Sequence, residues 1–371
     1  MQKALSHLKV IDLSRILAGP FASQTLGDMG AQVIKIEHPD GDDTRRWGPP
    51  FVERIDGSHD AAYFFCCNRN KTNVSLDFTQ TSDKAMLLDM IKDADVLIEN
   101  YKVGGLHKYG LDYDSIQSIN PRIIYCSITG FGQTGPYKER PGYDALIQGM
   151  GGLMSITGEA DGAPQKVGVA VVDLMTGMYA TTAILAALCY RDQTGIGQHI
   201  DLALFDVQAA MLANQASTYL MSGDVPIRKG SAHPSIAPYQ PMSVADGYIM
   251  LAIGNDRQFT ALCDAAECPE IAKDEHFSSN AARVKYRPEL ETALAPFLIR
   301  KNINEWIALG EQHGFPCGPI NTIDRVFADE QLLSRNMVVT TDDGSRLVAN
   351  PIKFSKTPIE QYTSPPVLKK N

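Results

Sequence analysis

Several features that the sequence lacks narrow the possibilities first. The 371 residues contain no apolar run near the roughly 18 that a membrane-spanning helix needs, and the N-terminus has no basic head followed by an apolar stretch. The seven cysteines are scattered, without a C-x-x-C pair or a zinc-type spacing to histidine. We therefore expect a cytoplasmic protein with no membrane association and no metal site. Cys66 and Cys67 are adjacent, and their aromatic neighbours predict that both are buried.

Positive charge is not concentrated anywhere in the chain. Lysine and arginine number 34 against 43 acidic residues, which gives a formal net charge of −9. Because the cations are dispersed and the total is negative, we expect no nucleic-acid partner. The first predicted strand-to-helix turn, residues 14–20, has neither G-x-G-x-x-G nor a Walker lysine. Glu37 ends the second predicted strand, where a ribose ligand would stand, so a dinucleotide enzyme stays open as a weak alternative.

What is present is an alternation of short apolar strands and helices. Consecutive strands joined by helical segments predict an open, Rossmann-like parallel sheet, and hence the α/β class. We place Gly19-Pro20 in a turn. Strands are predicted at residues 9–13, 31–37, 95–98, 123–128, 198–204 and 247–252, and helices at 21–29, 82–94, 113–119, 176–190, 205–220, 257–266, 287–298 and 304–313.

A change of pattern near residue 224 predicts a second, smaller α/β domain. Residues 224–241 hold four prolines and one histidine with little periodicity, which is typical of a linker or an active-site loop. We expect a large domain built from 1–200 and 335–371, a linker helix at 201–224, a small domain at 225–320 and a second linker at 321–334.

Asp173 stands out because it directly follows the apolar run at residues 167–172. A carboxylate beside apolar residues loses solvation, so it is normally paired, hydrogen-bonded or used chemically. Taken locally, the favoured interpretation is a helix N-cap, since aspartate is a preferred cap and a strong helix former follows. A catalytic role is the alternative.

Basic and polar residues follow the predicted strands: His38, Arg45, Arg46, Asn70, Lys71, Asn100, Tyr101, Lys102 and Lys108. Ligands of open α/β sheets bind beyond the carboxyl ends of the strands. Cations there suit a long, phosphorylated ligand. Each residue alone is equally compatible with a solvated loop.

Six segments carry a resemblance to a known family. They are Lys9 to Glu37, Asp95 to Leu111, Ser127 to Asp144, Val171 to Ala180, Thr194 to Asp206 and Gly318 to Gln331, in this order along the chain. Together they resemble the family III CoA-transferases, over nearly the whole length. Residues 232–259 most resemble the succinyl-CoA:glutarate and acetyl-CoA:oxalate branches.

The resemblance implies that Asp173 is a nucleophile that receives CoA from an acyl-CoA through anhydride and thioester intermediates. Coenzyme A and acyl-CoA would be substrates, with no cofactor bound permanently. Tyr143 stands where related racemases carry a catalytic histidine, and a phenol is a poor proton shuttle. This favours CoA transfer over racemisation. A 2-methylacyl-CoA racemase is the alternative enzyme, and a non-catalytic CoA-binding protein is the alternative outside enzymes.

The family pattern also assigns binding residues and an assembly. It implies CoA contacts from Ile16, Ala18, His38, Leu76, Asn100, Tyr101 and Lys108. His38 departs from an arginine common in the family, and Leu17 from a glutamine of the formyl-CoA:oxalate enzymes. A dicarboxylate acceptor needs a cation or hydrogen-bond donors, and the candidates for the substrate site are Leu17, Arg45, Arg46, Tyr63, Tyr143, His233 and Gln240. Succinyl-CoA is the expected donor, and an interlocked homodimer the expected assembly.

Overall fold

The computed structural model describes residues 3–369, which divide into two compact units. Of the described residues, the first unit comprises 3–153, 166–223 and 330–369, and the second comprises 154–165 and 224–329. Each is described by itself. The short helix α6 (Leu153–Ile156) lies at the boundary between them in the sequence.

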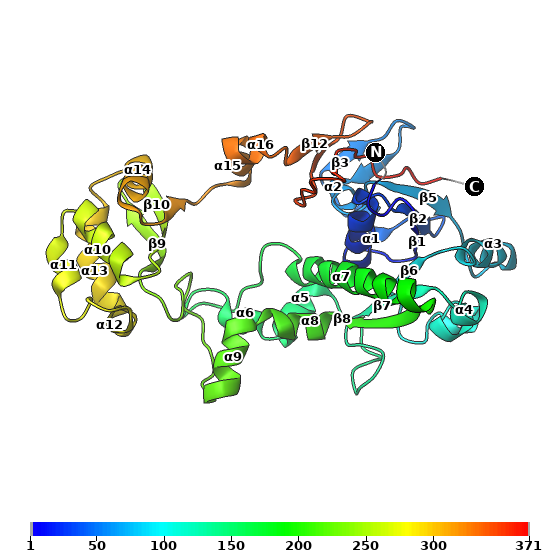
Figure 1. Ribbon diagram of the computed structural model, residues 1–371, viewed down its shortest axis with the longest axis horizontal. Coiled ribbons are helices and arrows are strands. Elements are labelled where there is room, and N and C mark those ends of the chain that lie inside the picture. Colours follow the sequence, from blue (N-terminus) through cyan, green and yellow to red (C-terminus); the bar gives the residue numbers. More distant parts are fainter. Residues whose placement is uncertain (1–2, 370–371) are drawn as a thin grey trace. The chain divides into compact units, whose positions relative to one another are not determined.

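The first unit is built on a six-stranded, all-parallel sheet (Figure 1). Its strand order, β5-β2-β1-β6-β7-β8, is the third-second-first-fourth-fifth-sixth order of the doubly wound Rossmann sheet. The predicted parallel sheet is therefore confirmed, with one strand, β5, that the sequence analysis did not identify. The strands are β1 (Lys9–Asp12), β2 (Gln32–Glu37), β5 (Lys71–Ser75), β6 (Val96–Glu99), β7 (Ile124–Thr129) and β8 (Gln198–Ala203).

Helices cover both faces of this sheet because successive strand residues point to opposite sides. Val10 of β1 packs in the core beneath α1 (Ala18–Asp28) and α7 (Val171–Thr194), whereas Ile11 faces the core formed with α3 (Thr81–Ile91) and α4 (Tyr113–Ile119). Further elements of this unit are α2 (Ala62–Phe65), α5 (Asp144–Met150), α8 (Leu204–Met211), α9 (Ala213–Ser222), α16 (Glu330–Ser334), β3 (Phe51–Glu53), β4 (His59–Ala61), β12 (Val338–Thr340), β13 (Arg346–Val348), η1 (Asp43–Arg46) and η2 (His107–Tyr109).

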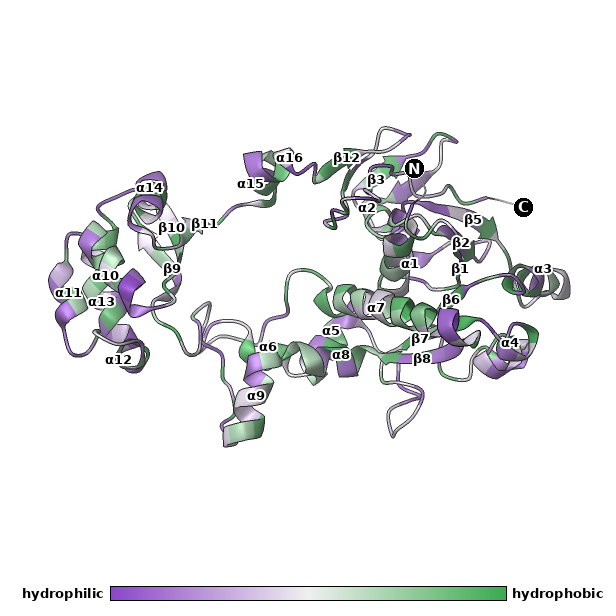
Figure 2. Ribbon diagram, viewed as in Figure 1, coloured by the Kyte–Doolittle hydropathy of each residue, from purple (hydrophilic) through white to green (hydrophobic). Residues whose placement is uncertain are grey.

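Helix α7 is long and apolar enough, by length and composition, to cross a membrane. Within the fold it is a core helix that lies beside α1 (Figure 1), and 44% of its most apolar window is buried. Figure 2 colours much of α7 as hydrophobic. Met175, Met178 and Tyr179 of this helix are exposed. Some of the apolar side chains of α7 are therefore buried in the core of the first unit, and others are exposed on its outer face.

The second unit is a smaller α/β unit, built around a three-stranded antiparallel sheet of order β11-β10-β9. Trp306 is fully buried in its core, and its indole N–H donates to the Leu298 carbonyl at 2.9 Å. The elements are β9 (Tyr239–Val244), β10 (Gly247–Ala252), β11 (Cys317–Pro319), α10 (Asp256–Ala265), α11 (Pro269–Lys273), α12 (Asn280–Lys285), α13 (Arg287–Leu298), α14 (Ile303–His313) and α15 (Ile323–Ala328).

Some local predictions were wrong. Gly19 and Pro20 lie inside the first turn of α1 rather than in a loop, because proline is well tolerated at a helix start. The helix predicted at 205–220 is two helices, broken where Ala213 adopts a left-handed φ of 43°. Cys67 is buried as expected, but Cys66 is exposed.

Candidate functional site

The carboxyl ends of β1 and β6 mark the point where the strand order reverses, which is where open α/β sheets bind ligands. A cavity of about 230 Å³ lies there, and Asp173 lines it. The turn after β1 (residues 15–18), the segment after β6 (100–103) and the loop 138–143 form most of the remaining wall. The sequence-predicted nucleophile thus faces the ligand position of the fold.

A second cavity of about 370 Å³ adjoins the first. Arg15, Asp43 and Tyr101 line both cavities, and the second one also reaches His38 and Leu76. The guanidinium of Arg15 lies over the Tyr101 ring, 5.2 Å from its centroid. The two cavities together can take a ligand longer than either one, and the Arg15 side chain lies where they meet.

The predicted helix cap at Asp173 was wrong. Helix α7 begins at Val171, so Asp173 is its third residue, and its carboxylate makes no capping hydrogen bond. The cap comes instead from Asp144 at the start of α5, whose Oδ2 accepts from the backbone N–H of Val172 at 2.8 Å and of Asp173 at 3.2 Å. Gln148 donates to the other oxygen of Asp144 at 2.6 Å. Asp144 therefore fixes the helix end and leaves Asp173 unengaged.

Burial and a neighbouring charge perturb Asp173. Loss of solvation, followed by the repulsion of Asp144, raises the pKa of Asp173 from 3.8 to about 7. No hydrogen-bond donor among residues 3–369 offsets this by binding its carboxylate. A desolvated carboxylate of raised pKa in a cavity is a group suited to chemistry rather than to structure.

A single glycine allows the two helices of the site to approach closely. A Cβ added at Gly177 would lie 2.7 Å from the backbone oxygen of Ala18 and 3.1 Å from the Phe21 ring. Gly177 is one turn beyond Asp173, and Ala18 begins α1. This contact therefore brings the start of α1 next to Asp173. Leu17, the N-cap of α1, makes no side-chain capping hydrogen bond, and Leu17 and Ala18 line the cavity. The positive end of the α1 dipole therefore lies at the cavity without a capping side chain.

Two further glycines close the far wall. The chain passes so tightly between the end of β7 and the loop before α5 that a Cβ at Gly142 would lie 2.4 Å from the Cα of Gly130. The next residue after Gly142 is Tyr143, the exposed N-cap of α5, followed by Asp144. The contact thus positions both the cavity-lining tyrosine and the acid that caps α7.

Most sequence-predicted site residues meet in these cavities. The Asp173 cavity contains Ile16, Leu17, Ala18, Asn100, Tyr101 and Tyr143, and the adjoining cavity contains His38, Leu76 and Tyr101. Tyr63 lies near enough to Asp173 for that charge to contribute to the increase in its pKa, although burial is the larger cause. Lys108 lies beside Tyr109 and lines neither cavity, and His233 belongs to the second unit.

Other predicted candidates are used by the fold. Arg45 is buried, with its guanidinium nitrogens bound to Glu37 at 2.7 and 2.8 Å and to Asp60 at 2.8 Å. With the Pro366 carbonyl, which accepts at 3.0 Å, these partners engage four of its five N–H groups. Glu37 is also occupied, by Arg45, Asn73 and the Asp42 N–H, which removes the basis for a ribose ligand. Lys71 stands at the start of β5, not at a carboxyl end, and its buried ammonium pairs with Asp12 at 3.0 Å.

Sequence reasoning missed four charged residues of the site. Arg15, Lys138 and Arg140 supply cations to the Asp173 cavity, and Asp144 binds the backbone N–H groups of Val172 and Asp173. Lys138, Arg140 and Asp144 lie in a segment that carried the family resemblance, but no local periodicity distinguishes them from loop residues. The loop's proximity to Asp173 depends on the Gly130–Gly142 contact, which joins residues 12 positions apart.

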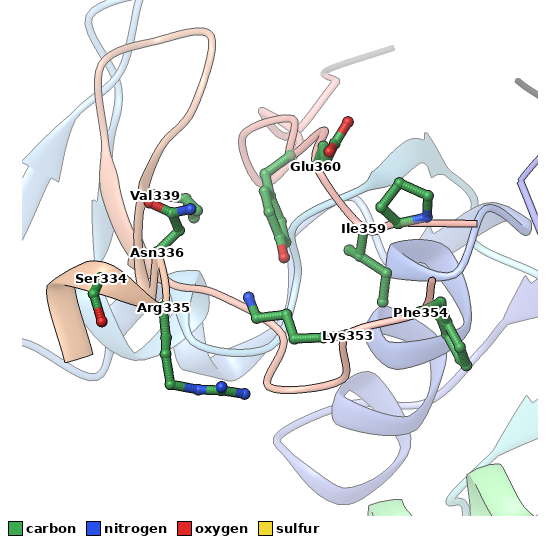
Figure 3. A pocket seen from close by; sticks show the side chains of 10 residues that line it. Ser334, Arg335, Asn336, Val339, Lys353, Phe354, Ile359 and Glu360 are labelled. Carbon is green, nitrogen blue, oxygen red and sulfur yellow. The ribbon is translucent and has the colours of Figure 1, made fainter. Parts of the chain in front are cut away.

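Two further cavities share no lining residue with the Asp173 cavity. One of about 470 Å³, near the C-terminal part of the first unit, is lined by Arg335, Lys353 and Tyr362 among others (Figure 3). Another, of about 490 Å³, lies in the second unit beside Arg287 and Gln240. Within residues 3–369 no group of three or more histidine, cysteine or acidic side chains is arranged to hold a metal ion.

Comparison with known proteins adds the following findings. The profile of CoA-transferase family III matches residues 5–371. Succinate–glutarate CoA-transferase of Agrobacterium fabrum is 49% identical over 98% of this chain and 92% of that protein. Human succinyl-CoA:glutarate CoA-transferase is 41% identical over 99% of this chain and 84% of its own length. The crystal structure of a CAIB/BAIF family protein from Brucella suis superposes with a TM-score of 0.91 at 50% identity, covering 100% of this chain and 97% of that one.

Proposed function

The chain belongs to CoA-transferase family III and transfers CoA between an acyl-CoA and a carboxylic acid, and we propose that Asp173 carries this transfer from succinyl-CoA to a dicarboxylic acid. The observation that supports the proposal most directly is the placement of Asp173. Its carboxylate is desolvated, lacks a hydrogen-bond partner within residues 3–369, and lines the cavity at the switch point of the sheet.

The first half of the reaction moves CoA onto the protein. An oxygen of ionised Asp173 attacks the thioester carbonyl, the C–S bond breaks, and CoA leaves as a thiolate while a mixed anhydride forms. The thiolate then attacks the Asp173 carbonyl carbon. The anhydride C–O bond breaks, succinate leaves, and Asp173 holds CoA as a thioester.

The second half repeats these steps with the acceptor. Its carboxylate attacks the Asp173 thioester, which releases CoA thiolate and forms a new anhydride. The thiolate attacks the acceptor's carbonyl carbon, so the acceptor leaves as its CoA thioester and Asp173 is regenerated. Each step exchanges one activated carboxyl for another, so the thioester energy is kept as long as water stays out of the cavity.

The surroundings of Asp173 suit these steps. The uncapped start of α1, at Leu17 and Ala18, provides a positive helix end where the tetrahedral oxyanions form. Arg15 and Tyr101, which line both cavities, are suited to bind the diphosphate and pantetheine of CoA. Ile16, Ala18, Asn100, His38 and Leu76 line the same two cavities and are the further proposed contacts. Lys108 is the least supported of these contacts, because it lines neither cavity.

For the acceptor, cations at the cavity matter most. Lys138 and Arg140 line the Asp173 cavity and are suited to the second carboxylate of a dicarboxylic acid, next to Leu17 and Tyr143. Tyr63 remains a candidate near Asp173. We withdraw Arg45, which is buried and bound to Glu37 and Asp60, and retain His233 only as a residue of the second unit.

The proposal is tested by an acceptor panel. Purified protein is incubated with succinyl-CoA or acetyl-CoA and with oxalate, glutarate, malate, citramalate or acetate, and new CoA thioesters are quantified. We expect transfer from succinyl-CoA to a dicarboxylate, with Asp173→Asn inactive but still binding CoA. Activity of Asp173→Asn contradicts the assignment. Exchange of the α-hydrogen of a 2-methylacyl-CoA without acyl exchange indicates a racemase, and CoA binding without turnover a binding protein.

We further propose a homodimer located in the cytoplasm. The outer face of α7 exposes Met175, Met178, Tyr179 and Tyr190, and the end of α9 exposes Leu220 and Met221. Faces of this kind usually mark an association surface. Light scattering at several protein concentrations tests the dimer, and replacing Met178 by glutamate is expected to weaken it. A monomer at all concentrations contradicts it.

A further inference from the structure

Ile16 lies in the site with a backbone φ of +72°. This left-handed conformation is unusual for any residue other than glycine and most of all for a β-branched one. Such conformations persist only where the surrounding structure imposes them, and they cluster at functional sites. The conformation therefore needs a physical cause.

The cause is a buried ion pair on the inner side of the turn. The Nζ of Lys35 lies 3.0 Å from Oδ2 of Asp42, and both side chains are fully buried. Lys35 donates to the Ser14 carbonyl at 2.9 Å, and Asp42 accepts from the Ile16 N–H at 3.3 and 3.4 Å. The pair thus holds the residues on both sides of Arg15.

Other contacts complete the arrangement. The side chain of Asn100 accepts from the Arg15 N–H at 2.9 Å and donates to its carbonyl at 2.7 Å. Thr44 donates to Asp42 through its N–H at 3.0 Å and its hydroxyl at 2.8 Å. Burial disfavours the charged form of Lys35, but the combined attraction of Asp42, Asp12 and Glu37 outweighs it and raises the pKa of Lys35. The pair is therefore ionised at neutral pH.

A buried ion pair contributes little net stability compared with apolar residues of the same volume, so stability alone does not explain this one. We propose that Lys35 and Asp42 are positioning residues that hold Ile16 in its left-handed conformation, so that the turn 15–18 presents its backbone, and the side chains on either side of Ile16, to acyl-CoA. The proposal rests on the proposed function, because it takes the cavity beside this turn to be the acyl-CoA site.

The test first removes the charges of Lys35 and Asp42, and then adds a glycine at position 16, which adopts the left-handed conformation without the ion pair. In Lys35→Met/Asp42→Asn no charge is left unpaired, and we expect the dissociation constant of CoA to rise at least tenfold, as does KM for the acyl-CoA. Adding Ile16→Gly is expected to bring both values back to within about threefold of the original protein, because glycine adopts φ near +72° without the clamp. A purely structural role of the pair does not predict this rescue.

A second buried pair provides the matched control. A guanidinium nitrogen of Arg69 lies 2.6 Å from a carboxylate oxygen of Asp28, and Arg69 also donates to the Val348 carbonyl. Neither residue lines the Asp173 cavity or the cavity that adjoins it. Arg69→Met/Asp28→Asn is expected to lower the melting temperature while CoA affinity stays within about twofold. An equal loss of CoA affinity in this control, or a failure of Ile16→Gly to rescue, overturns the proposal.

If the Lys35→Met/Asp42→Asn variant does not fold, single substitutions at Ile16 test the same conformation directly. Proline cannot adopt a positive φ and has no N–H for Asp42, so Ile16→Pro is expected to weaken CoA binding at least tenfold, and Ile16→Gly by no more than about threefold. Equal CoA binding by the two contradicts the positioning role. CoA binding is measured directly, so failure of the original protein to bind CoA refutes the proposed function instead.

Discussion

Replacing Asp173 by asparagine should make the protein more stable at neutral pH while abolishing transfer. The pKa of Asp173 is raised from 3.8 to about 7 by burial and by Asp144. A carboxyl whose pKa is raised by folding contributes its full stability below the unfolded-state pKa, and that stability is lost as the pH rises through the folded-state value. One pKa unit corresponds to about 1.36 kcal/mol. The raised pKa of Asp173 therefore lowers the free energy of unfolding by about 1.5 kcal/mol at pH 5, where the group is protonated only in the folded protein, and by about 4 kcal/mol at pH 8.

The assay is chemical denaturation of both proteins at pH 5 and pH 8, at one protein concentration so that any association is held constant. Asp173→Asn should exceed the original protein in free energy of unfolding, and by more at pH 8. Asp206 is an exposed acid at the same third position of its helix, α8, and Asp206→Asn should change stability by less than about 0.5 kcal/mol. The reasoning is refuted if Asp173→Asn is no more stable than the original at pH 8, or if its advantage does not grow with pH.

Three further predictions concern the same site. Because Asp173 must be ionised to attack, kcat/KM should fall about tenfold per pH unit below pH 7. Asp144→Asn removes a neighbouring negative charge, so the pH at which kcat/KM begins to fall should be lower in this variant. An unchanged pH profile would contradict an effect of the Asp144 charge on the pKa of Asp173. Gly177→Ala should lower kcat by about 10- to 100-fold with the fold retained, since its Cβ meets the Ala18 oxygen, whereas Gly318→Ala, with nothing within 4 Å, should be neutral in steady-state assays. Gly142→Ala should reduce both the rate of CoA transfer and the melting temperature, because its Cβ would collide with the Gly130 Cα. Full activity of this variant would show that the close Gly130–Gly142 contact is dispensable.

The sheet of the first unit was predictable because its strands are short apolar runs separated by helices. Residues 9–12 and 124–128 of β1 and β7 are apolar enough to be recognised as buried strands without tertiary information. Strand β5 escaped because its sequence, KTNVS, is polar: Lys71 and Asn73 are buried through Asp12 and Glu37, not through apolar contacts. Burial of that kind depends on partners distant in sequence.

The candidate site was predictable only in part, for a similar reason. Asp173 is conspicuous after an apolar run, but its local interpretation as a cap fails because the cap is Asp144, 29 residues earlier. Arg45 resembled a substrate ligand in sequence, yet Glu37 and Asp60 bind it inside the fold. Charged residues can be recognised from sequence, whereas the choice between a buried ion pair and an open cavity is made by tertiary contacts.

The central claim is that Asp173 itself carries CoA during transfer. The direct measurement is to incubate the protein with succinyl-CoA alone, quench with hydroxylamine or borohydride, and map the modified residue by peptide mass spectrometry. We predict a hydroxamate or a reduced alcohol on Asp173, absent when acyl-CoA is omitted and absent in Asp173→Asn. An unmodified Asp173 peptide from a protein that transfers CoA at its full rate would contradict the account.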